Sequence, residues 1–218
     1  KMMMLLQYAI NRSGPMSMAA SLGVGFLKTA PSISRPDIQF HIQPFSSDDP
    51  TQGTHSFSAF TTSVTQLRPE STGFIKLKSA NIFDHPKISP CYLSHEIDIE
   101  TIIKGVDIAI KIASAEPLRS SIDDIYSPGM NELKGGGNGI LEWIRRSAVT
   151  IYHPVGTCKM GSDILSVVNH RLKVHGIDAL RVVDASIMPR ITSGNTNAPT
   201  IMIGEKASDL ILEETKAT

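Results

Sequence analysis

Alternating apolar and polar residues predict strands in the first part of the chain. Residues 37–43 place Ile, Phe and Ile on one side and Gln, His and Gln on the other, which is the period of a half-buried strand. Residues 56–67, rich in Phe, Thr, Val and Ser, and residues 73–78 predict two further strands. Because no helical pattern separates them, we expect an antiparallel sheet.

Helical spacing replaces this alternation further along the chain. Apolar residues fall at helical intervals over residues 99–113, and Pro117 stops the pattern. A shorter amphipathic helix is predicted with apolar positions 140, 141, 144 and 148 on its inner face. Between them, residues 134–139 are glycine-rich and predict a flexible loop. Their glycine spacing fits neither GxGxxG nor the phosphate-binding P-loop.

Both ends of the chain also predict helix. Residues 1–10 have the pattern of the end of a helix whose beginning has been cut away, because turn-forming residues follow them. Residues 199–213 predict a helix with Asn197 as its N-cap and Pro199 in its first turn. Before it, the β-branched run 180–185 predicts a buried strand that leads into a ligand-facing turn.

Composition narrows the class of protein. The 218 residues contain 21 Lys plus Arg and 21 Asp plus Glu, and no basic stripe with aromatics, so nucleic acid is not an expected partner. No apolar run approaches the roughly 20 residues needed to span a bilayer. Cys91 and Cys158 form no CxxC pair, which favours reduced thiols and the cytoplasm.

His153 is the histidine with the most distinctive surroundings. Pro154 and Gly156 follow it and predict an extended, tight backbone around the imidazole. A metal site is not expected, because no second cluster of His or Cys has ligand spacing. A nucleophilic pair with Cys158 stays open, and the adjacent Lys159 is its only hint of thiolate stabilisation.

A polar bend over residues 192–199 supplies the other candidates. Asn195 and Asn197 suit either a bend or cap or a ligand contact, because asparagine is common in both. Asp184 likewise suits a turn or a hydrogen bond to a ligand. The residues alone leave these alternatives open.

The order of these motifs resembles a known family. Residues 153–161 (HPVGTCKMG), 180–189 (LRVVDASIMP) and 193–207 (SGNTNAPTIMIGEKA) resemble the carboxy-terminal signature of the glucose–methanol–choline (GMC) flavoprotein oxidoreductases. Residues 67–73 and 89–94 resemble substrate-domain segments of the same family. The similarity covers essentially the whole chain and is closest to the branch similar to choline dehydrogenase.

The resemblance implies FAD-dependent oxidation of an alcohol to an aldehyde, with hydride transfer to flavin N5. It implies that His153 and Asn195 are catalytic. His153 would accept the hydroxyl proton or stabilise the developing alkoxide, and Asn195 would hydrogen-bond the substrate oxygen. The implied FAD contacts are Asp184, Ala185, Asn197, Pro199 and Thr200. We also expect the amino-terminal end of the helix near Pro199 to stabilise the reduced flavin, because that end carries a partial positive charge.

The resemblance further implies a fold class and a partner. We expect an α+β chain, in which residues 1–148 form a substrate-binding domain with an antiparallel sheet backed by helices. Residues 149–218 would complete a Rossmann-like FAD-binding domain. In this family, the half that carries the GxGxxG motif binds part of FAD, and that motif is missing here. The chain alone should therefore not bind FAD tightly. The expected partners are an alcohol substrate and this missing half. Peripheral membrane association and a homo-oligomer remain open.

Three other functions are weighed against this one. A hydroxynitrile lyase of the same family would keep the flavin without redox chemistry. A non-catalytic fragment would retain the fold without the cofactor half. A cysteine hydrolase would use Cys158.

Overall fold

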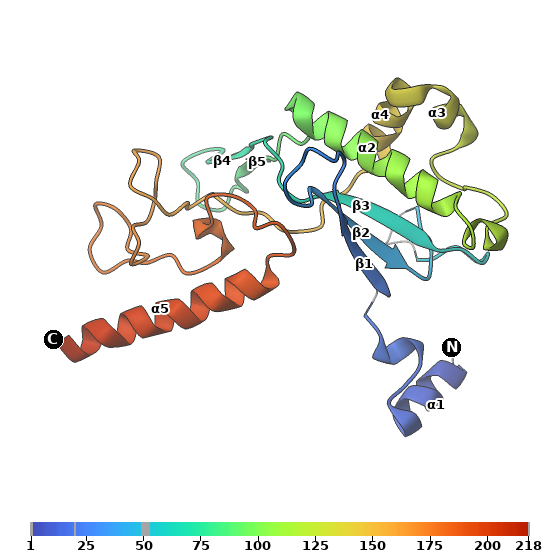
Figure 1. Cartoon of the computed structure of the whole chain (residues 1–218). Coiled ribbons are helices and arrows are strands. Elements are labelled where there is room, and N and C mark those ends of the chain that lie inside the picture. Colours follow the sequence, from blue (N-terminus) through green and yellow to red (C-terminus); the bar gives the residue numbers. More distant parts are fainter. Residues whose placement is uncertain (1, 20, 49–52, 218) are drawn as a thin grey trace. The chain divides into compact units, whose positions relative to one another are not determined.

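The structure is a computed structural model and describes residues 2–19, 21–48 and 53–217. The chain forms two compact units. The first comprises Lys1–Gln66 and Thr101–Asp124, and the second comprises Leu67–Glu100 and Ile125–Thr218. Helices accompany antiparallel strands (Figure 1), so the predicted α+β class is confirmed. The predicted domain boundary between residues 148 and 149 stays a prediction.

A three-stranded antiparallel sheet is the centre of the first unit. Its strands, in spatial order, are β1 (Gly23–Leu27), β2 (Ile38–Gln43) and β3 (Thr61–Gln66). The alternation over residues 37–43 correctly predicts the strand β2, whose Ile38 and Phe40 are 0% and 3% exposed. The expected apolar and polar sides are not kept throughout, because Gln39 is 2% exposed and Ile42 is 42% exposed. β3 is shorter than the predicted strand, and β1 is an addition to the prediction.

Helix α2 (Glu96–Ala113) begins in the second unit, and from Thr101 onward it belongs to the first unit and lies along this sheet (Figure 1). The helix predicted from residue 99 is confirmed and begins slightly earlier. Val106 is buried at 5% exposure, and a Cβ on Gly105 would stand 2.6 Å from Val64 Cγ1. Glycine therefore permits the close approach of helix and sheet. The unit also contains α1 (Met2–Asn11), which confirms the helix predicted at residues 1–10, η1 (Pro15–Ser17) and η2 (Arg119–Ser121).

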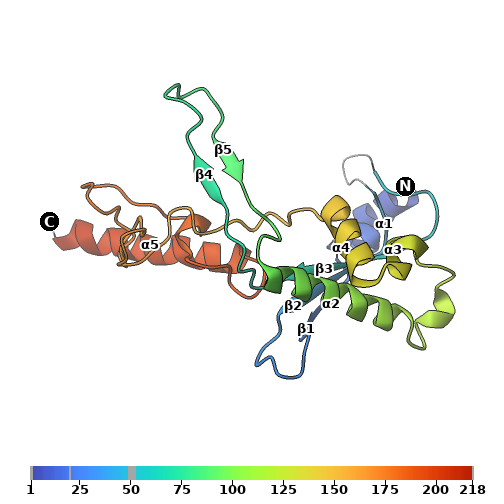
Figure 2. The same cartoon turned by 90° about the horizontal axis from the view of Figure 1, so that it is seen from above.

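In the second unit, β4 (Phe74–Lys76) pairs antiparallel with β5 (Lys87–Ser89). Figure 2 shows the long loop that joins them. Three large apolar side chains between the strands are 86–88% exposed: Leu77, Ile82 and Phe83. Burying such side chains is favourable, so this loop is a candidate contact surface.

The base of this hairpin is tied to the first turn of α2, which belongs to the same unit. The carboxylate of Asp98 is 1% exposed and accepts hydrogen bonds from the backbone N–H groups of Glu70, at 2.9 Å, and Ser71, at 2.7 Å. A buried carboxylate needs such donors to offset its lost hydration. Asp98 therefore fixes the segment that precedes β4.

The glycine-rich segment 134–139 departs from its prediction. Instead of a flexible loop, it joins α3 (Met130–Lys134) to α4 (Gly136–Ser147) and supplies the first turn of α4. The first N–H groups of a helix need no partner within it, so glycines are tolerated there. Ile140 and Ile144, each 3% exposed, anchor the helix as the amphipathic pattern predicted. Ala148, predicted on the same inner face, is exposed and follows the end of the helix.

Residues 180–185 also depart from their prediction, because they do not form a strand. Arg181 makes a single antiparallel bridge to Lys173, and the chain then enters the short helix η3 (Ala185–Ile187). Leu180 and Val183 are 46% and 36% exposed, so the predicted buried strand is wrong. β-branched residues favour a strand, but a continuous pairing partner decides whether it forms.

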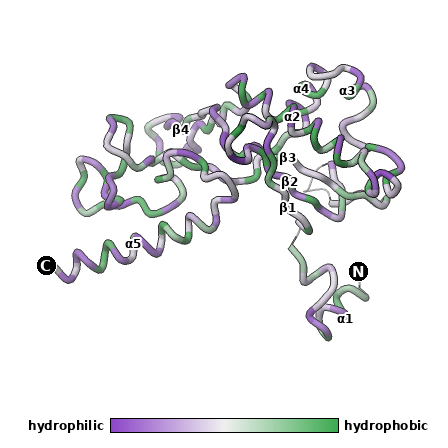
Figure 3. The backbone as a smooth tube through the Cα atoms, in the orientation of Figure 1, coloured by the Kyte–Doolittle hydropathy of each residue, from purple (hydrophilic) through white to green (hydrophobic). Residues whose placement is uncertain are grey.

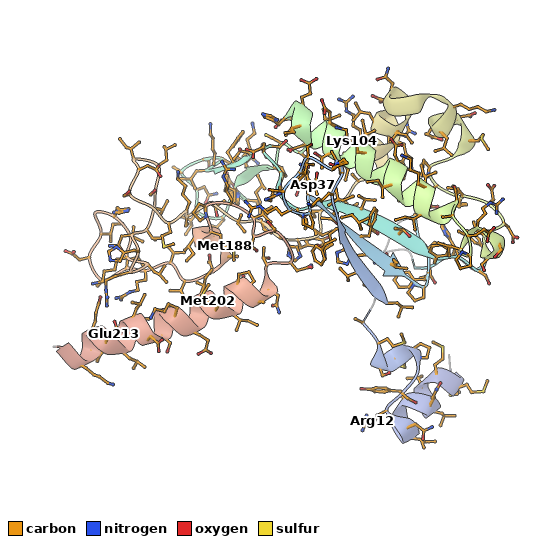
Figure 4. The ribbon with its side chains drawn as sticks, viewed as in Figure 1. Arg12, Asp37, Lys104, Met188, Met202 and Glu213 are labelled. Carbon is orange, nitrogen blue, oxygen red and sulfur yellow. The ribbon has the colours of Figure 1, made fainter. Side chains whose placement is uncertain are left out.

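Helix α5 (Asn197–Ala217) organises the core of the second unit. Its buried Ile203, Ala207 and Leu210 are spaced as one helical face, and polar and apolar residues mix along its length (Figure 3). They pack with residues from the preceding segments: Val168, Leu172, Ile187 and Met188. Met188 is labelled in Figure 4. No helix within the described residues is long and apolar enough to cross a membrane.

Candidate active site

A hydrogen-bonded triplet lies at the amino-terminal end of α5. Asn195 Nδ2 is 2.8 Å from His153 Nε2, and Thr196 Oγ1 is 2.9 Å from His153 Nδ1. His153 is half-buried, Asn195 is exposed, and Thr196 is 6% exposed. The imidazole is thus held on its inner side by Thr196, while its outer nitrogen lies at the surface beside an amide.

The loop that carries His153 is shaped by its immediate neighbours. Tyr152 has a φ of 60° and Gly156 a φ of 86°, so left-handed backbone flanks the histidine on both sides. The backbone N–H groups of Gly156 and Cys158 both donate to the carbonyl of Ser186, at 3.1 Å. These bonds attach the histidine loop to η3.

Asp184 begins η3. Its side chain accepts hydrogen bonds from the backbone N–H of Ser186, at 2.8 Å, and from the Ser186 hydroxyl. Because the Ser186 carbonyl accepts from the histidine loop, Asp184 stabilises the short helix to which that loop is bonded. η3 also contacts α5.

The start of α5 is built around Thr196. The helix begins at Asn197, so the N-cap position falls on Thr196 rather than on Asn197 as predicted. The Thr196 carbonyl accepts from the backbone N–H of Thr200, at 3.0 Å, and from its hydroxyl, at 2.6 Å. Pro199 lies in the first turn as predicted, where its missing N–H costs no helical hydrogen bond.

The structure therefore brings some of the predicted site residues together. His153 and Asn195, 42 positions apart in the sequence, are in direct contact. The predicted cofactor contacts fall in two places, the first turn of α5 (Asn197, Pro199, Thr200) and the start of η3 (Asp184, Ala185). Their contact with FAD stays a prediction. Sequence reasoning missed Thr196, although a threonine just before a predicted helix is a recognised capping signal.

The geometry also bears on the alternative chemistries. Both ring nitrogens of His153 are bonded, to Asn195 and Thr196, so neither is directed at the Cys158 thiol. This disfavours a Cys–His nucleophilic pair. In the described part of the chain, no group of three or more His, Cys, Asp or Glu side chains is arranged to hold a metal ion.

Two carboxyl groups with lowered pKa values lie outside the triplet. Hydrogen bonds from the Ser166 hydroxyl and Lys159 lower the pKa of Asp163 to about 2. Hydrogen bonds from Arg181 and then Lys173 lower the pKa of Glu214 to about 2. Both carboxylates are held by these partners.

Sequence comparison places this arrangement in a family. Residues 69–204 match the family model described as GMC oxidoreductase, and the chain belongs to that family. It is 41% identical over 210 residues to an alcohol dehydrogenase [acceptor] of Pseudomonas putida, a match covering 96% of this chain and 38% of that protein. It is 42% identical over 189 residues to the mitochondrial choline dehydrogenase of Mus musculus, covering 86% and 31%.

Solved structures agree with the fold. A crystal structure of formate oxidase matches with a TM-score of 0.83 at 25% identity, over 99% of this chain and 42% of that one. Pyridoxine 4-oxidase from Mesorbium loti matches with a TM-score of 0.76 at 25% identity, over 87% and 37%. The chain thus spans well under half the length of these relatives, and the predicted resemblance to the GMC family is confirmed.

Proposed function

We propose that the protein containing this chain oxidises an alcohol to an aldehyde with FAD, using His153 and Asn195 at the reacting hydroxyl. The single observation that carries this proposal is the 2.8 Å contact between the His153 and Asn195 side chains at the amino-terminal end of α5. Similarity to dehydrogenases named for alcohol and choline supports the substrate class.

The residues of this chain fit a flavin partner. The first turn of α5 begins directly after the triplet, and Asn197 and Ala198 are exposed there. Helix N-terminal N–H groups attract negative charge, which suits a ring that becomes anionic when reduced. Asn197, Pro199 and Thr200 would lie against the ring system, and the backbone of Asp184 and Ala185 would contact the rest of FAD. Bound FAD would supply the acceptor for the hydride that leaves the alcohol carbon.

The triplet can divide the work on the hydroxyl group. A substrate oxygen that enters between Asn195 and His153 would replace their direct hydrogen bond with one bond to each. Its proton would pass to His153 Nε2 as the carbon loses hydride, and positioned proton transfer of this kind contributes about 10²–10⁴-fold. The Asn195 amide would donate to the oxygen and hold the C–H bond in place.

A second part of the proposal concerns the partner of this chain. The GMC relatives are more than twice its matched length, so we infer that their remaining portion supplies the other part of the FAD site. The exposed Leu77, Ile82 and Phe83 of the β4–β5 loop support such a partner, since their burial would be favourable. Formate oxidase, one of the structural matches, is described with a modification of its FAD.

Anaerobic reduction of the flavin tests the proposal. The full-length protein, purified with its native cofactor, is mixed with a panel of primary alcohols that includes choline. Bleaching of the oxidised flavin band by at least one alcohol is the expected result, and parallel assays with oxygen and an artificial acceptor separate oxidase from dehydrogenase.

Two results would contradict it. A colourless full-length protein would favour the non-catalytic reading. A yellow protein that no alcohol reduces, but that cleaves or forms a cyanohydrin, would favour a hydroxynitrile lyase. The similarity to dehydrogenases named for alcohol and choline makes the redox reaction the preferred assignment.

A further inference from the structure

Thr196 is the partner of the inner nitrogen of His153, and the proposed function gives it no role. Its hydroxyl lies 2.9 Å from Nδ1 and it is 6% exposed. Within the described residues its hydroxyl makes no other hydrogen bond. A buried hydroxyl devoted to one imidazole nitrogen can set the orientation and the hydrogen position of that ring.

The local sequence explains why this hydroxyl is available. A threonine at an N-cap normally accepts a hydrogen bond from the backbone N–H of the second or third helical residue. In α5 the third residue is Pro199, which has no N–H. The proline therefore removes a usual competitor for the hydroxyl of Thr196, which bonds to His153 instead.

The hydrogen bonds around the ring form a consistent set. An amide nitrogen is a donor and not an acceptor, so Asn195 Nδ2 must donate to His153 Nε2. Nε2 of a neutral imidazole can accept only if the ring hydrogen is on Nδ1. Thr196 Oγ1 then accepts from Nδ1–H across the 2.9 Å contact.

We propose that Thr196 is a positioning residue that holds His153 in the tautomer with hydrogen on Nδ1, leaving the Nε2 lone pair ready for a substrate hydroxyl. The catalytic consequence rests on the proposed function, whereas the tautomer itself does not. Thr196 does this without adding a charge beside the ring. Losing one neutral hydrogen bond of this kind should slow the proton-accepting step by about two- to tenfold.

The test uses the flavin-containing full-length protein and three variants. Thr196→Val removes the hydroxyl and keeps the shape, while Thr196→Ser restores a hydroxyl. Thr215→Val is the matched control, because Thr215 lies on the same helix and its hydroxyl bonds to the Ile211 carbonyl. The expected result is a two- to tenfold slower flavin reduction in Thr196→Val, with unchanged flavin content and substrate half-saturation. Thr196→Ser and Thr215→Val should reduce at nearly the wild-type rate.

A second readout is independent of turnover. In ¹⁵N-histidine-labelled protein, with the His153 signals assigned by their loss in His153→Gln, Nδ1 should carry the hydrogen at a pH where the ring is neutral. Thr196→Val should shift the ring towards a tautomer mixture. Hydrogen on Nε2 in the wild type would overturn the proposal, and so would an unchanged tautomer and rate in Thr196→Val.

The two readouts separate this inference from the proposed function. If no alcohol reduces the flavin but Nδ1–H is present and depends on Thr196, the function fails and the positioning role stands. If Thr196→Val does not fold, the proposal is tested by the tautomer of His153 in the wild type and by the rate of flavin reduction in Thr196→Ser.

Discussion

The two ends of α5 are held by different kinds of interaction. At the amino end, Thr196 and Asn195 bond to His153 through neutral groups. At the carboxyl end, near Glu213 in Figure 4, Glu214 makes ion pairs with three cationic side chains. The shortest nitrogen–oxygen distances are 3.1 Å for Arg171, 3.0 Å for Lys173 and 2.6 Å for Arg181.

This contrast separates a binding end from a structural end. Acidic residues near a helix carboxyl terminus are disfavoured by the helix dipole, and the three cations offset that penalty. Arg171 also pairs with Glu213, so three cations share two carboxylates, and these ion pairs fix the side chains in place. The neutral bonds at the amino end can open at low cost when a hydroxyl group enters. The same helix thus presents exchangeable partners at one end and fixed charges at the other.

Replacing His153 should have the largest effect and should be confined to the amino end. We expect His153→Gln to slow anaerobic flavin reduction by about 10²–10⁴-fold, because the proton acceptor is lost. Flavin content and thermal stability should change little. Stopped-flow measurement of the flavin band gives the rate, and absorbance per protein gives the content.

The matched control is His170→Gln, an exposed histidine in the turn before Arg171. It should reduce its flavin at the wild-type rate. If His153→Gln reduced its flavin at the wild-type rate, the imidazole would have no role in the mechanism. The two ends of α5 would then not differ in function.

A smaller effect is expected when the amide is removed. Asn195→Ala should slow flavin reduction by about 10- to 100-fold, the size of a lost hydrogen bond to a developing charge. Asn195→His, which keeps a donor, should recover part of the rate. Asn138→Ala, on the exposed face of α4, is the control. Equal rates for Asn195→Ala and the wild type would show that the 2.8 Å contact has no catalytic use.

The strands and helices that the sequence predicts correctly are those with a strong local pattern. The alternation in β2 and the helical spacing in α2 and α5 are visible without knowing any partner. β1 was missed because Gly23 and Gly25 interrupt its pattern, and it forms by pairing with β2. The run 180–185 has strand-forming residues but only the bridge at Arg181, which no local pattern reveals.

The site was predictable in part for the same reason. His153 and Asn195 stood out through a resemblance, and their contact depends on η3 and α5 bringing two distant loops together. Thr196 lies inside the polar bend predicted at residues 192–199, where nothing local distinguishes a capping hydroxyl from one that contacts a distant side chain. Only the folded structure shows that this hydroxyl lies beside His153 Nδ1. Whether the Thr196 hydroxyl caps its own helix or bonds to the distant imidazole depends on the tertiary structure.

The smallest predicted effect tests the carboxyl end. Glu214→Gln removes the charge shared by Arg171, Lys173 and Arg181, so we expect a modest fall in the thermal midpoint at pH 7 and no change in the rate of flavin reduction. Glu205→Gln is the control, because Glu205 is exposed on the same helix and outside the ion pairs of the described residues. A large loss of activity in Glu214→Gln with its fold intact would contradict a purely structural end.

The pH dependence of stability sets the direction of the difference expected between the wild type and Glu214→Gln. Hydrogen bonds from Arg181 and Lys173 hold the folded pKa of Glu214 at about 2, below its ordinary value of 4.5. Its stabilisation is therefore fully present above about pH 4.5 and is lost as the pH falls towards 2. The difference in thermal midpoint between the wild type and Glu214→Gln should shrink over that interval. Asp163, also with a pKa of about 2, titrates equally in both proteins, so a difference that persisted at low pH would mean that the ion pairs do not hold this end of α5.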